Sequence, residues 1–538
     1  MASRPLLVLI LACALAFALV GIDWGLPFNW HADEKVNLAA SMIDRHTANP
    51  GFFVNPTLHL YVVAAVVRAA YAVYPGTFVP SDVRWHVLST RRNAPNRAVT
   101  FLAYRLARSI SVTFALGTVW LLWRRGRAAF DDTTGLLAAG CLALTMGLAN
   151  LAHFATPETM LFFIVLAALG SLEAIAESPS RVRYAIAGAL IGLACSTKYT
   201  VWLLGVPFLA AHIKSQRRES IVRHSAWVLL ACGAAVLAFV IGTPFSVLSA
   251  RRFLEDLWFN WTTGAPAGTL SGQQRSWIAY TLTLGNALGW PLFLAMMSGA
   301  AVVAARARRL TDRASASLVV HGTWIAAFWA FYGISPHHAL RFIMPIVPSL
   351  ILLGAAGIVY IARLSRTRRR IMTALMSAVL LYSAVYTAAA DRKFLADPRY
   401  AAGAWLKQRV PPSGTIGFFT NESYLPYFDR PAYAISAIDV MSQLGITGDA
   451  FQARIDQVVD AGPDIIVDAN FYFDRFLGAP AVYPERADFY RRLLAGAGAG
   501  TYRPVAKFSL HGPRWLDPQP ELVAPDVYIF ARASTRWE

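Results

Sequence analysis

Long apolar runs separated by clusters of arginine constrain this chain more than any other feature of its sequence. A helix needs about twenty apolar residues to cross the ~30 Å hydrocarbon core of a bilayer. Such runs, some of them short, lie at residues 5–22, 101–123, 133–152, 157–174, 183–196, 199–213, 226–248, 276–305, 318–335, 339–362 and 370–390. Because 56% of its residues are hydrophobic and only 15% are charged, the chain is not expected to form a soluble fold. We therefore predict an α-helical polytopic membrane protein with about eleven transmembrane helices.

Two of these runs leave an alternative open. Residues 183–196 and 199–213 are individually short and meet at Ser196-Thr197-Lys198. They form either a tight pair of helices or one broken helix.

The amphipathic run Thr57–Tyr74 decides the orientation, because counting it as a span would reverse every later helix. If it does not span, one side of the membrane collects Arg4 and the basic clusters within 124–127, 181–183, 214–223, 306–313 and 363–370. Cytoplasmic loops carry such an excess of Arg and Lys. We therefore expect a cytoplasmic N-terminus, a first external loop at 23–100 that contains an interfacial or re-entrant helix at 57–74, and a last span that ends outside.

The composition changes near Asp391, where Pro and Asp become more frequent and short apolar runs alternate with amphipathic ones. These patterns predict helices at 399–410, 450–461 and 484–494, and strands at 415–419, 465–468, 505–509 and 527–531. We predict two domains: a transmembrane domain at 1–390 and a soluble extracytoplasmic α/β domain at 391–538.

Charge and cysteine usage exclude other classes. The formal net charge of +18 comes mostly from the clusters between apolar runs, so it indicates membrane orientation and not nucleic-acid binding. The cysteines lie inside apolar runs without CxxC spacing, which supports neither a disulfide framework nor a thiolate zinc site. The first run is interpreted as a retained span because many spans follow it. The excess of Arg over Lys and the high Ala content suggest a bacterial source.

Two adjacent carboxylates, Asp33 and Glu34, follow the first span and its interfacial aromatic residues. An ionised pair at this depth is costly unless it faces water, a cation or a substrate. A carboxylate here can act as a general base on an acceptor hydroxyl, with a raised pKa if it is partly desolvated. The alternative is that Asp33 caps a helix over 35–43 and Glu34 occupies its first turn.

Glu158 is a second candidate acid, at the start of the run that begins near Pro157. Thr156 as a helix cap and Pro157 in the first turn explain the local sequence without any function. In the predicted orientation, however, Glu158 lies on the same external face as Asp33. Two acids there can divide the work of base and of metal or acceptor orientation.

Three cations are expected on that face at the ends of spans: Arg108, Lys198 and Arg341. Cations at such depth usually pair with something, and the alternatives are a structural acid or a phosphate group. His31 and His338 are candidate substrate contacts. Neither belongs to a recognisable zinc motif, so we predict no metal site and leave a divalent cation open.

Six short motifs in order resemble those of a known family: His31-Ala32-Asp33-Glu34, Asn55-Pro56-Thr57-Leu58-His59-Leu60-Tyr61, Ala107-Arg108-Ser109, Phe154-Ala155-Thr156-Pro157-Glu158, Ser196-Thr197-Lys198-Tyr199 and Arg341-Phe342-Ile343-Met344-Pro345. Together they resemble the polytopic GT-C glycosyltransferases of the protein O-mannosyltransferase and aminoarabinose transferase type, which are glycosyltransferase family 39-like. The tail after residue 390 is similar to the extracytoplasmic domain of bacterial members.

The resemblance implies an inverting transfer of a sugar from a polyprenyl-phosphate-linked donor to a lipid, glycan or protein acceptor on the extracytoplasmic face of a bacterial plasma membrane. It implies that Asp33 is the catalytic base, Glu34 its motif neighbour and Glu158 a second important acid. Arg108, Lys198 and Arg341 match the family's basic positions. Ala32 departs from a common Pro, which changes only the stiffness of the loop.

Two other functions fit a polytopic chain. In a lipid or solute transporter the same charges would line a translocation path, but transporters tend to show repeated halves, and none is visible here. A scaffold that only presents the 391–538 domain would not need charged residues at several helix ends.

Overall fold

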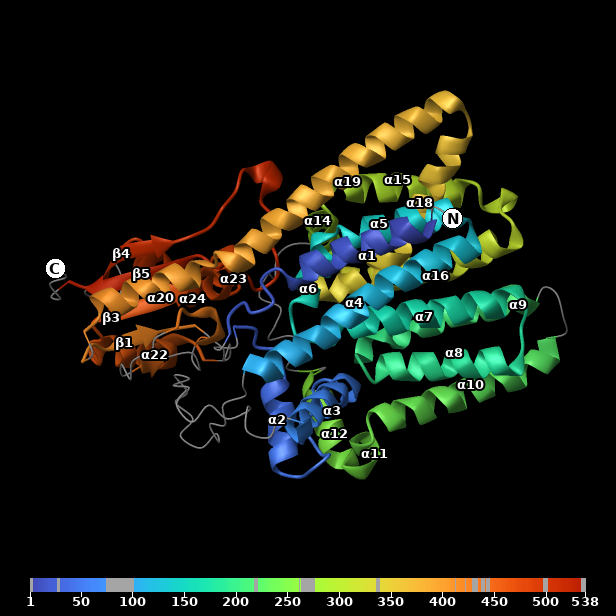
Figure 1. Cartoon of the computed structure of the whole chain (residues 1–538). Helices are drawn as coiled ribbons and strands as arrows, with labels where there is room; N and C mark the ends of the chain where they lie inside the picture. Colours follow the sequence, from blue (N-terminus) through green and yellow to red (C-terminus); the bar gives the residue numbers. More distant parts are fainter. Residues whose placement is uncertain are drawn as a thin grey trace.

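A computed structural model describes residues 3–26, 30–73, 101–216, 221–260, 262, 276–334, 339–411, 413–420, 422–427, 434–436, 441, 446–496 and 502–533. A bundle of long helices forms one part, and a sheet flanked by helices lies beyond one end of it (Figure 1). The predicted class, a helical membrane protein with a C-terminal α/β region, is confirmed.

Each predicted apolar run is helical. The helices are α1 (Ser3–Leu19), α4 (Phe101–Ala129), α5 (Asp132–Ala143), α6 (Met146–Ala152), α7 (Glu158–Glu177), α8 (Arg181–Cys195), α9 (Gly205–Gln216), α10 (Ile221–Gly242), α11 (Phe245–Leu248), α14 (Ser276–Leu288), α15 (Trp290–Ala305), α16 (Asp312–Ile334), α17 (Leu340–Ile343), α18 (Val347–Arg363) and α19 (Arg366–Leu395). Runs 183–196 and 199–213 form two helices, α8 and α9, separated by the 3₁₀ helix Tyr199–Leu204.

Five of the described helices are long and apolar enough to cross a membrane alone: α4, α7, α16, α17 with α18, and the helix that begins at Arg366. The pairs α5–α6 and α14–α15 raise this number to seven if each is one span. They bend by 60° and by 111°, the second at Gly289, whose φ is 77°. The count of about eleven spans stays a prediction for the shorter helices.

Small residues let the helices pack closely. A Cβ on Gly188 or Gly192 of α8 would lie 2.0 or 2.1 Å from the carbonyl oxygens of Ala231 and Ala235 on α10. Glycines spaced by four residues on one helix face are a usual device for close contact in membranes. The outer face of α10 exposes Leu229, Val236 and Ile241, as expected of a helix that faces lipid.

Polar side chains cap several helices beside the predicted basic clusters. Asp131 accepts a hydrogen bond from the backbone of Thr134, and Ser180 and Ser365 do the same at the starts of α8 and α19. The alternative that Asp33 caps the next helix is wrong, because α2 (Val36–Asp44) begins after Lys35, which makes no side-chain cap. At α7 the capping position belongs to Pro157 and not to Thr156.

Helix α3 (Leu58–Val73) corresponds to the predicted interfacial helix. It packs with α2 and the start of α4 around Val36, Val63 and Tyr104 (Figure 1). The segment before α3 binds α12 (Ala250–Phe259) through a hydrogen bond from the Phe53 N–H to Asp256. Residues 74–100 of the predicted first loop lie outside the described residues.

The C-terminal sheet has the strand order β2-β1-β3-β5-β4. Its strands are β1 (Ile416–Phe418), β2 (Ala434–Ser436), β3 (Ile465–Ala469), β4 (Tyr502–Phe508) and β5 (Val527–Arg532). β1 is parallel to β2 and β3, whereas β5 is antiparallel to β3 and β4. The helices are α20 (Pro398–Arg409), α22 (Gly448–Asp460), α23 (Asn470–Gly478) and α24 (Pro484–Leu494). All predicted elements are present; β2 and α23 were not predicted.

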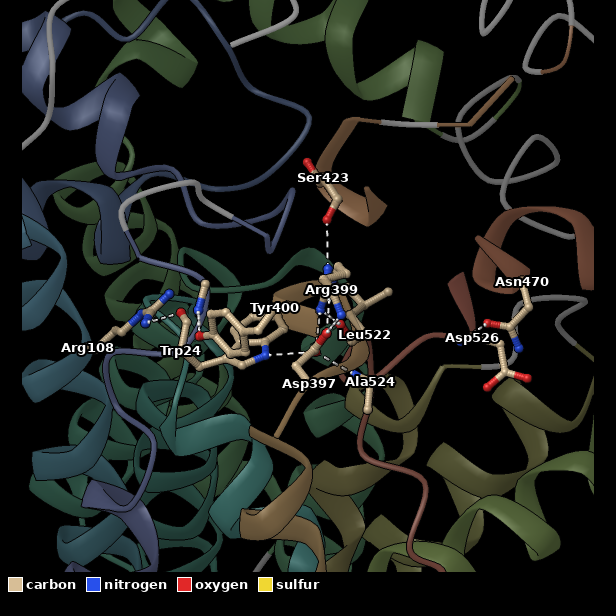
Figure 2. Close-up of polar contacts among 11 residues, drawn as sticks. Trp24, Arg108, Asp397, Arg399, Tyr400, Ser423, Asn470, Leu522, Ala524 and Asp526 are labelled. Atoms are coloured by element: carbon tan, nitrogen blue, oxygen red, sulfur yellow. Dashed lines mark hydrogen bonds and ion pairs between the residues drawn. The ribbon is translucent and has the colours of Figure 1, made fainter. Parts of the chain in front are cut away.

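A buried ion pair joins this region to the first loop (Figure 2). Asp397 accepts hydrogen bonds from Trp24 Nε1 at 3.0 Å and from the backbone of Ala524 at 2.8 Å. Its partner Arg399 lies 4.2 Å above the ring of Trp30. The backbone that leads to Asp33 is therefore fixed by residues that begin α20.

The N-terminus and the α18–α19 turn both lie at the end of the bundle away from the sheet (Figure 1). This arrangement agrees with the predicted grouping of Arg4 and the 363–370 cluster on one side.

Candidate active site

A cavity of about 570 Å³ lies where the ends of several helices meet. The segment before α2, the start of α3, the start of α7, the residues after α8, and α16 and α17 contribute to its wall. Four of the predicted site residues line it: Asp33, Glu158, Lys198 and Arg341. Residues from distant parts of the sequence therefore converge, as the topology argument predicts.

Arg341 is shared by two carboxylates. Its Nη2 lies 3.0 Å from Asp33 Oδ2, and its Nη1 pairs with Glu521. The backbone N–H of Arg341 also donates to Glu521 Oε2 at 2.9 Å. The guanidinium presents several N–H donors in a fixed plane, so it can hold two anions at once.

Asp33 stays ionised at neutral pH. Burial raises the pKa of its carboxyl. Arg341, together with His31, Lys35 and Lys198, lowers the pKa by more than burial raises it, so the net pKa lies below the usual value. The expectation of a raised pKa is therefore wrong, because it took account of desolvation and not of the cation 3.0 Å away.

His31 supports the turn that carries Asp33. Its Nδ1 accepts a hydrogen bond from the Asp33 backbone N–H at 3.2 Å, and its ring packs 4.2 Å from that of Phe154. Burial lowers the pKa of His31, so the ring is neutral at pH 7. His31 is only 2% exposed and is not part of the cavity wall.

Glu158 and Lys198 form the second ion pair of the cavity, with Lys198 Nζ 3.1 Å from Glu158 Oε1. Lys198 also lies 4.7 Å above the ring of Phe342. Glu158 is the first residue of α7, where the helix dipole adds to its stabilisation.

Glu34 and Arg108 bond to each other behind the cavity. Both side chains are fully buried, and two hydrogen bonds of 2.8 Å join Arg108 Nε and Nη2 to the two carboxylate oxygens. The backbone N–H of Ala155 donates to Glu34 Oε1, and Arg108 Nη1 donates to the carbonyls of Ile22 and Trp24. This arrangement ties the first loop to α4 and to the start of α7, which favours a positioning role over substrate contact.

Sequence reasoning did not identify Glu521. This residue lies in a segment that we call the strap, residues 517–526, which leaves the C-terminal region and reaches into the bundle. Lys393 binds Asp517 at 2.7 Å, Asn286 donates to the Gln519 carbonyl, and Glu521 N–H donates to Asn150. No local sequence pattern signals a contact between positions 341 and 521.

His338 lies outside the described residues. Among the residues that the structure does describe, no three His, Cys, Asp or Glu side chains are placed to hold a metal ion.

A family model and several solved structures are similar to this chain. Residues 102–243 match the family model described as dolichyl-phosphate-mannose-protein mannosyltransferase. The fold is similar to that of ArnT from Cupriavidus metallidurans bound to undecaprenyl phosphate, with 14% identity, 97% of each chain covered and a TM-score of 0.53. The chain is therefore similar to this mannosyltransferase family over residues 102–243 and to ArnT in its fold.

The fold is also similar to that of the oligosaccharyltransferase AglB from Archaeoglobus fulgidus, solved with an inhibitory peptide and a dolichol-phosphate. That match has 11% identity, covers 99% of this chain and 88% of the other, and has a TM-score of 0.53. No curated protein matches the sequence. The match of residues 102–243 to a family of transferases favours an enzyme over the alternative of a transporter without transferase activity.

Proposed function

We propose that this protein is a glycosyltransferase that moves a sugar, with inversion, from a polyprenyl-phosphate-linked donor to an acceptor on the extracytoplasmic face of the membrane. The observation that carries the proposal is one cavity in which the ionised Asp33 faces the cations Arg341 and Lys198 beside an aromatic wall. Proteins of the same fold bind undecaprenyl phosphate or dolichol-phosphate, which supports a lipid-phosphate donor.

In this reaction the acceptor oxygen attacks the anomeric carbon and the bond from that carbon to the phosphate oxygen breaks. Asp33 accepts the proton of the acceptor hydroxyl. Arg341 and Lys198 neutralise the charge that develops on the leaving phosphate, so no general acid is needed there. Attack opposite the leaving group inverts the anomeric centre.

Donor binding also frees the base. Arg341 pairs with both Asp33 and Glu521. A phosphate that takes up part of the guanidinium loosens the contact with Asp33, whose carboxylate can then accept a proton. Glu158, through its ion pair, orients Lys198.

Replacing Asp33 with Asn tests the assignment of the base. Loss of a positioned general base typically costs 10²- to 10⁴-fold in rate, and we expect a loss in this range for sugar transfer by the purified enzyme. Asp23→Asn is the matched control, because Asp23 also pairs with an arginine, Arg105, but lies outside the cavity wall. Equal activity of the two variants would remove Asp33 as the base.

We further propose that the cavity and the domain at 391–538 face the extracytoplasmic side. The clustered arginines of the far loops support this orientation. Labelling of single cysteines at positions 81 and 367 with a membrane-impermeant reagent tests it: only position 81 should react from outside. Reaction of both from the same side would contradict the topology.

A further inference from the structure

The cavity contains polar atoms that the proposed mechanism does not use. His59, in the first turn of α3, is 7% exposed and lines the cavity. Its Nε2 has no hydrogen-bond partner among the described residues. Native proteins rarely leave a buried polar atom unpaired, so such an atom at a cavity wall points to a ligand.

Glu158 offers a second atom of this kind. Its Oε1 binds Lys198, whereas its Oε2 has no hydrogen-bond partner within the described part of the chain. The Thr156 hydroxyl also acts on this carboxylate. Glu158 is also the charged group that acts on the His59 ring. His59 and Glu158 thus line the same cavity from α3 and α7, and each has an unpartnered polar atom.

The backbone before His59 is firmly held, so the ring is presented and not loosely placed. The Phe53 N–H donates to Asp256 at 2.7 Å, and the Val54 carbonyl accepts from Asn260. The Thr57 hydroxyl donates to the carbonyl of Gly242 at 3.0 Å. These bonds fix the entry into α3 against α10 and α12.

The donor has three parts, and only one suits this pair of atoms. An isoprenoid tail is apolar and offers nothing to hydrogen-bond. A phosphate would be repelled by the Glu158 carboxylate, and the cations Arg341 and Lys198 offer it a better site in the same cavity. Sugar hydroxyls both donate and accept, so they can donate to the carboxylate and bind the ring nitrogen in either tautomer.

We propose that His59 Nε2 and Glu158 Oε2 form a subsite for the hydroxyl groups of the donor sugar, next to the phosphate site. The inference rests on the proposed function and deepens it. Lys198 joins the two subsites, because it pairs with Glu158 and belongs to the phosphate site. Tyr332 and Phe342, whose stacked rings lie 5.9 Å apart, give the cavity an apolar wall for the carbon face of the sugar.

The test compares binding of two ligand types to the full-length protein in detergent. One is undecaprenyl phosphate, and the other is a panel of undecaprenyl phosphates that carry mannose, glucose, galactose or arabinose. For His59→Leu we expect about tenfold or greater loss of affinity for the best sugar-bearing ligand and no more than twofold change for undecaprenyl phosphate. His59→Gln, which keeps a polar group, should recover most of the loss. Tyr61→Phe, on the same helix but outside the cavity wall, is the control.

Ligand analogues give a second measurement that needs no folded variant. A deoxy sugar that lacks the bound hydroxyl should lose affinity for the wild-type protein. Equal loss of both ligand types in His59→Leu, no loss of either, or a panel that binds no better than undecaprenyl phosphate would each overturn the subsite. An effect confined to the KM of the acceptor would also overturn it. Failure of the proposed function is recognised separately, because the wild type would then not bind undecaprenyl phosphate.

Discussion

Replacing Glu34 with Gln separates a positioning role for this residue from a chemical one. The substitution removes one charge from an ion pair whose side chains are both 0% exposed. It leaves Arg108 charged and buried, with hydrogen bonds to the backbone of Ile22 and Trp24 but without a counter-charge. Breaking one partner of a buried pair costs about 3–5 kcal/mol, and because Gln still accepts a hydrogen bond we expect about 3 kcal/mol.

Asp33→Asn provides the contrast within the same loop. The Asp33 side chain is 41% exposed, and Arg341 keeps Glu521 as a partner when Asp33 is neutralised. An ion pair that exposed contributes about 1 kcal/mol or less. We therefore expect Glu34→Gln to lower stability strongly and Asp33→Asn to lower it little, although both reduce sugar transfer.

The assay is denaturant unfolding of the purified protein in detergent, followed by tryptophan fluorescence, with transfer measured on the same samples. The double variant Glu34→Gln/Arg108→Met removes both charges and should recover most of the lost stability. Wild-type stability of Glu34→Gln together with abolished transfer would refute a positioning role, and would make Glu34 a participant in the chemistry.

Three further predictions follow from the same geometry. Arg341 lowers the pKa of Asp33 although burial raises it. Protonation of Asp33 should therefore not reduce the wild-type rate above about pH 5, whereas Arg341→Met should move this loss of rate to higher pH. Identical pH–rate profiles of the two proteins would contradict this. Glu521→Gln removes an anion that competes for Arg341 and should tighten undecaprenyl phosphate binding several-fold in a titration, whereas weaker binding would show that Glu521 instead positions the guanidinium. Burial raises the pKa of Asp468 from 3.8 to about 7, so the stability contribution of this group is fully present below about pH 4 and is lost as the pH rises through 7. Asp468→Asn should flatten that dependence in unfolding midpoints measured between pH 5 and 8, and an unaltered slope would show that Asp468 is not its source.

The helices were predictable because span length and hydrophobicity are local properties. The 276–305 run shows the limit: it is apolar throughout, so composition does not reveal the bend of 111°. That bend depends on Gly289 adopting a positive φ against Tyr382, a contact made across the fold. Helix α23 was missed because Asn470–Gly478 directly follows a strand and is rich in aromatic residues.

The sequence predicted which residues come together at the site, but not which acid pairs with which cation. Alternation of the spans brought Asp33, Glu158, Lys198 and Arg341 to one end of the bundle. Which acid meets which cation depends on the path of the loops, and this is why Glu34 was not matched with Arg108. Glu521 reaches Arg341 only through the strap, whose residues Leu522 and Ala524 adopt left-handed φ values of 63° and 57° that tertiary contacts must maintain.

The two adjacent acids have opposite environments, and this difference decides which one is fit to be a base. Glu34 accepts three hydrogen bonds, from Arg108 Nε and Nη2 and from the Ala155 N–H, so protonation would disrupt the junction of three segments. The Asp33 contact with Arg341 uses one oxygen, Oδ2, at a partly exposed position from which a proton can pass to water after each turnover. A rigid pair beside an exchangeable one lets the enzyme protonate and deprotonate Asp33 in every cycle while the loop that carries it keeps its conformation.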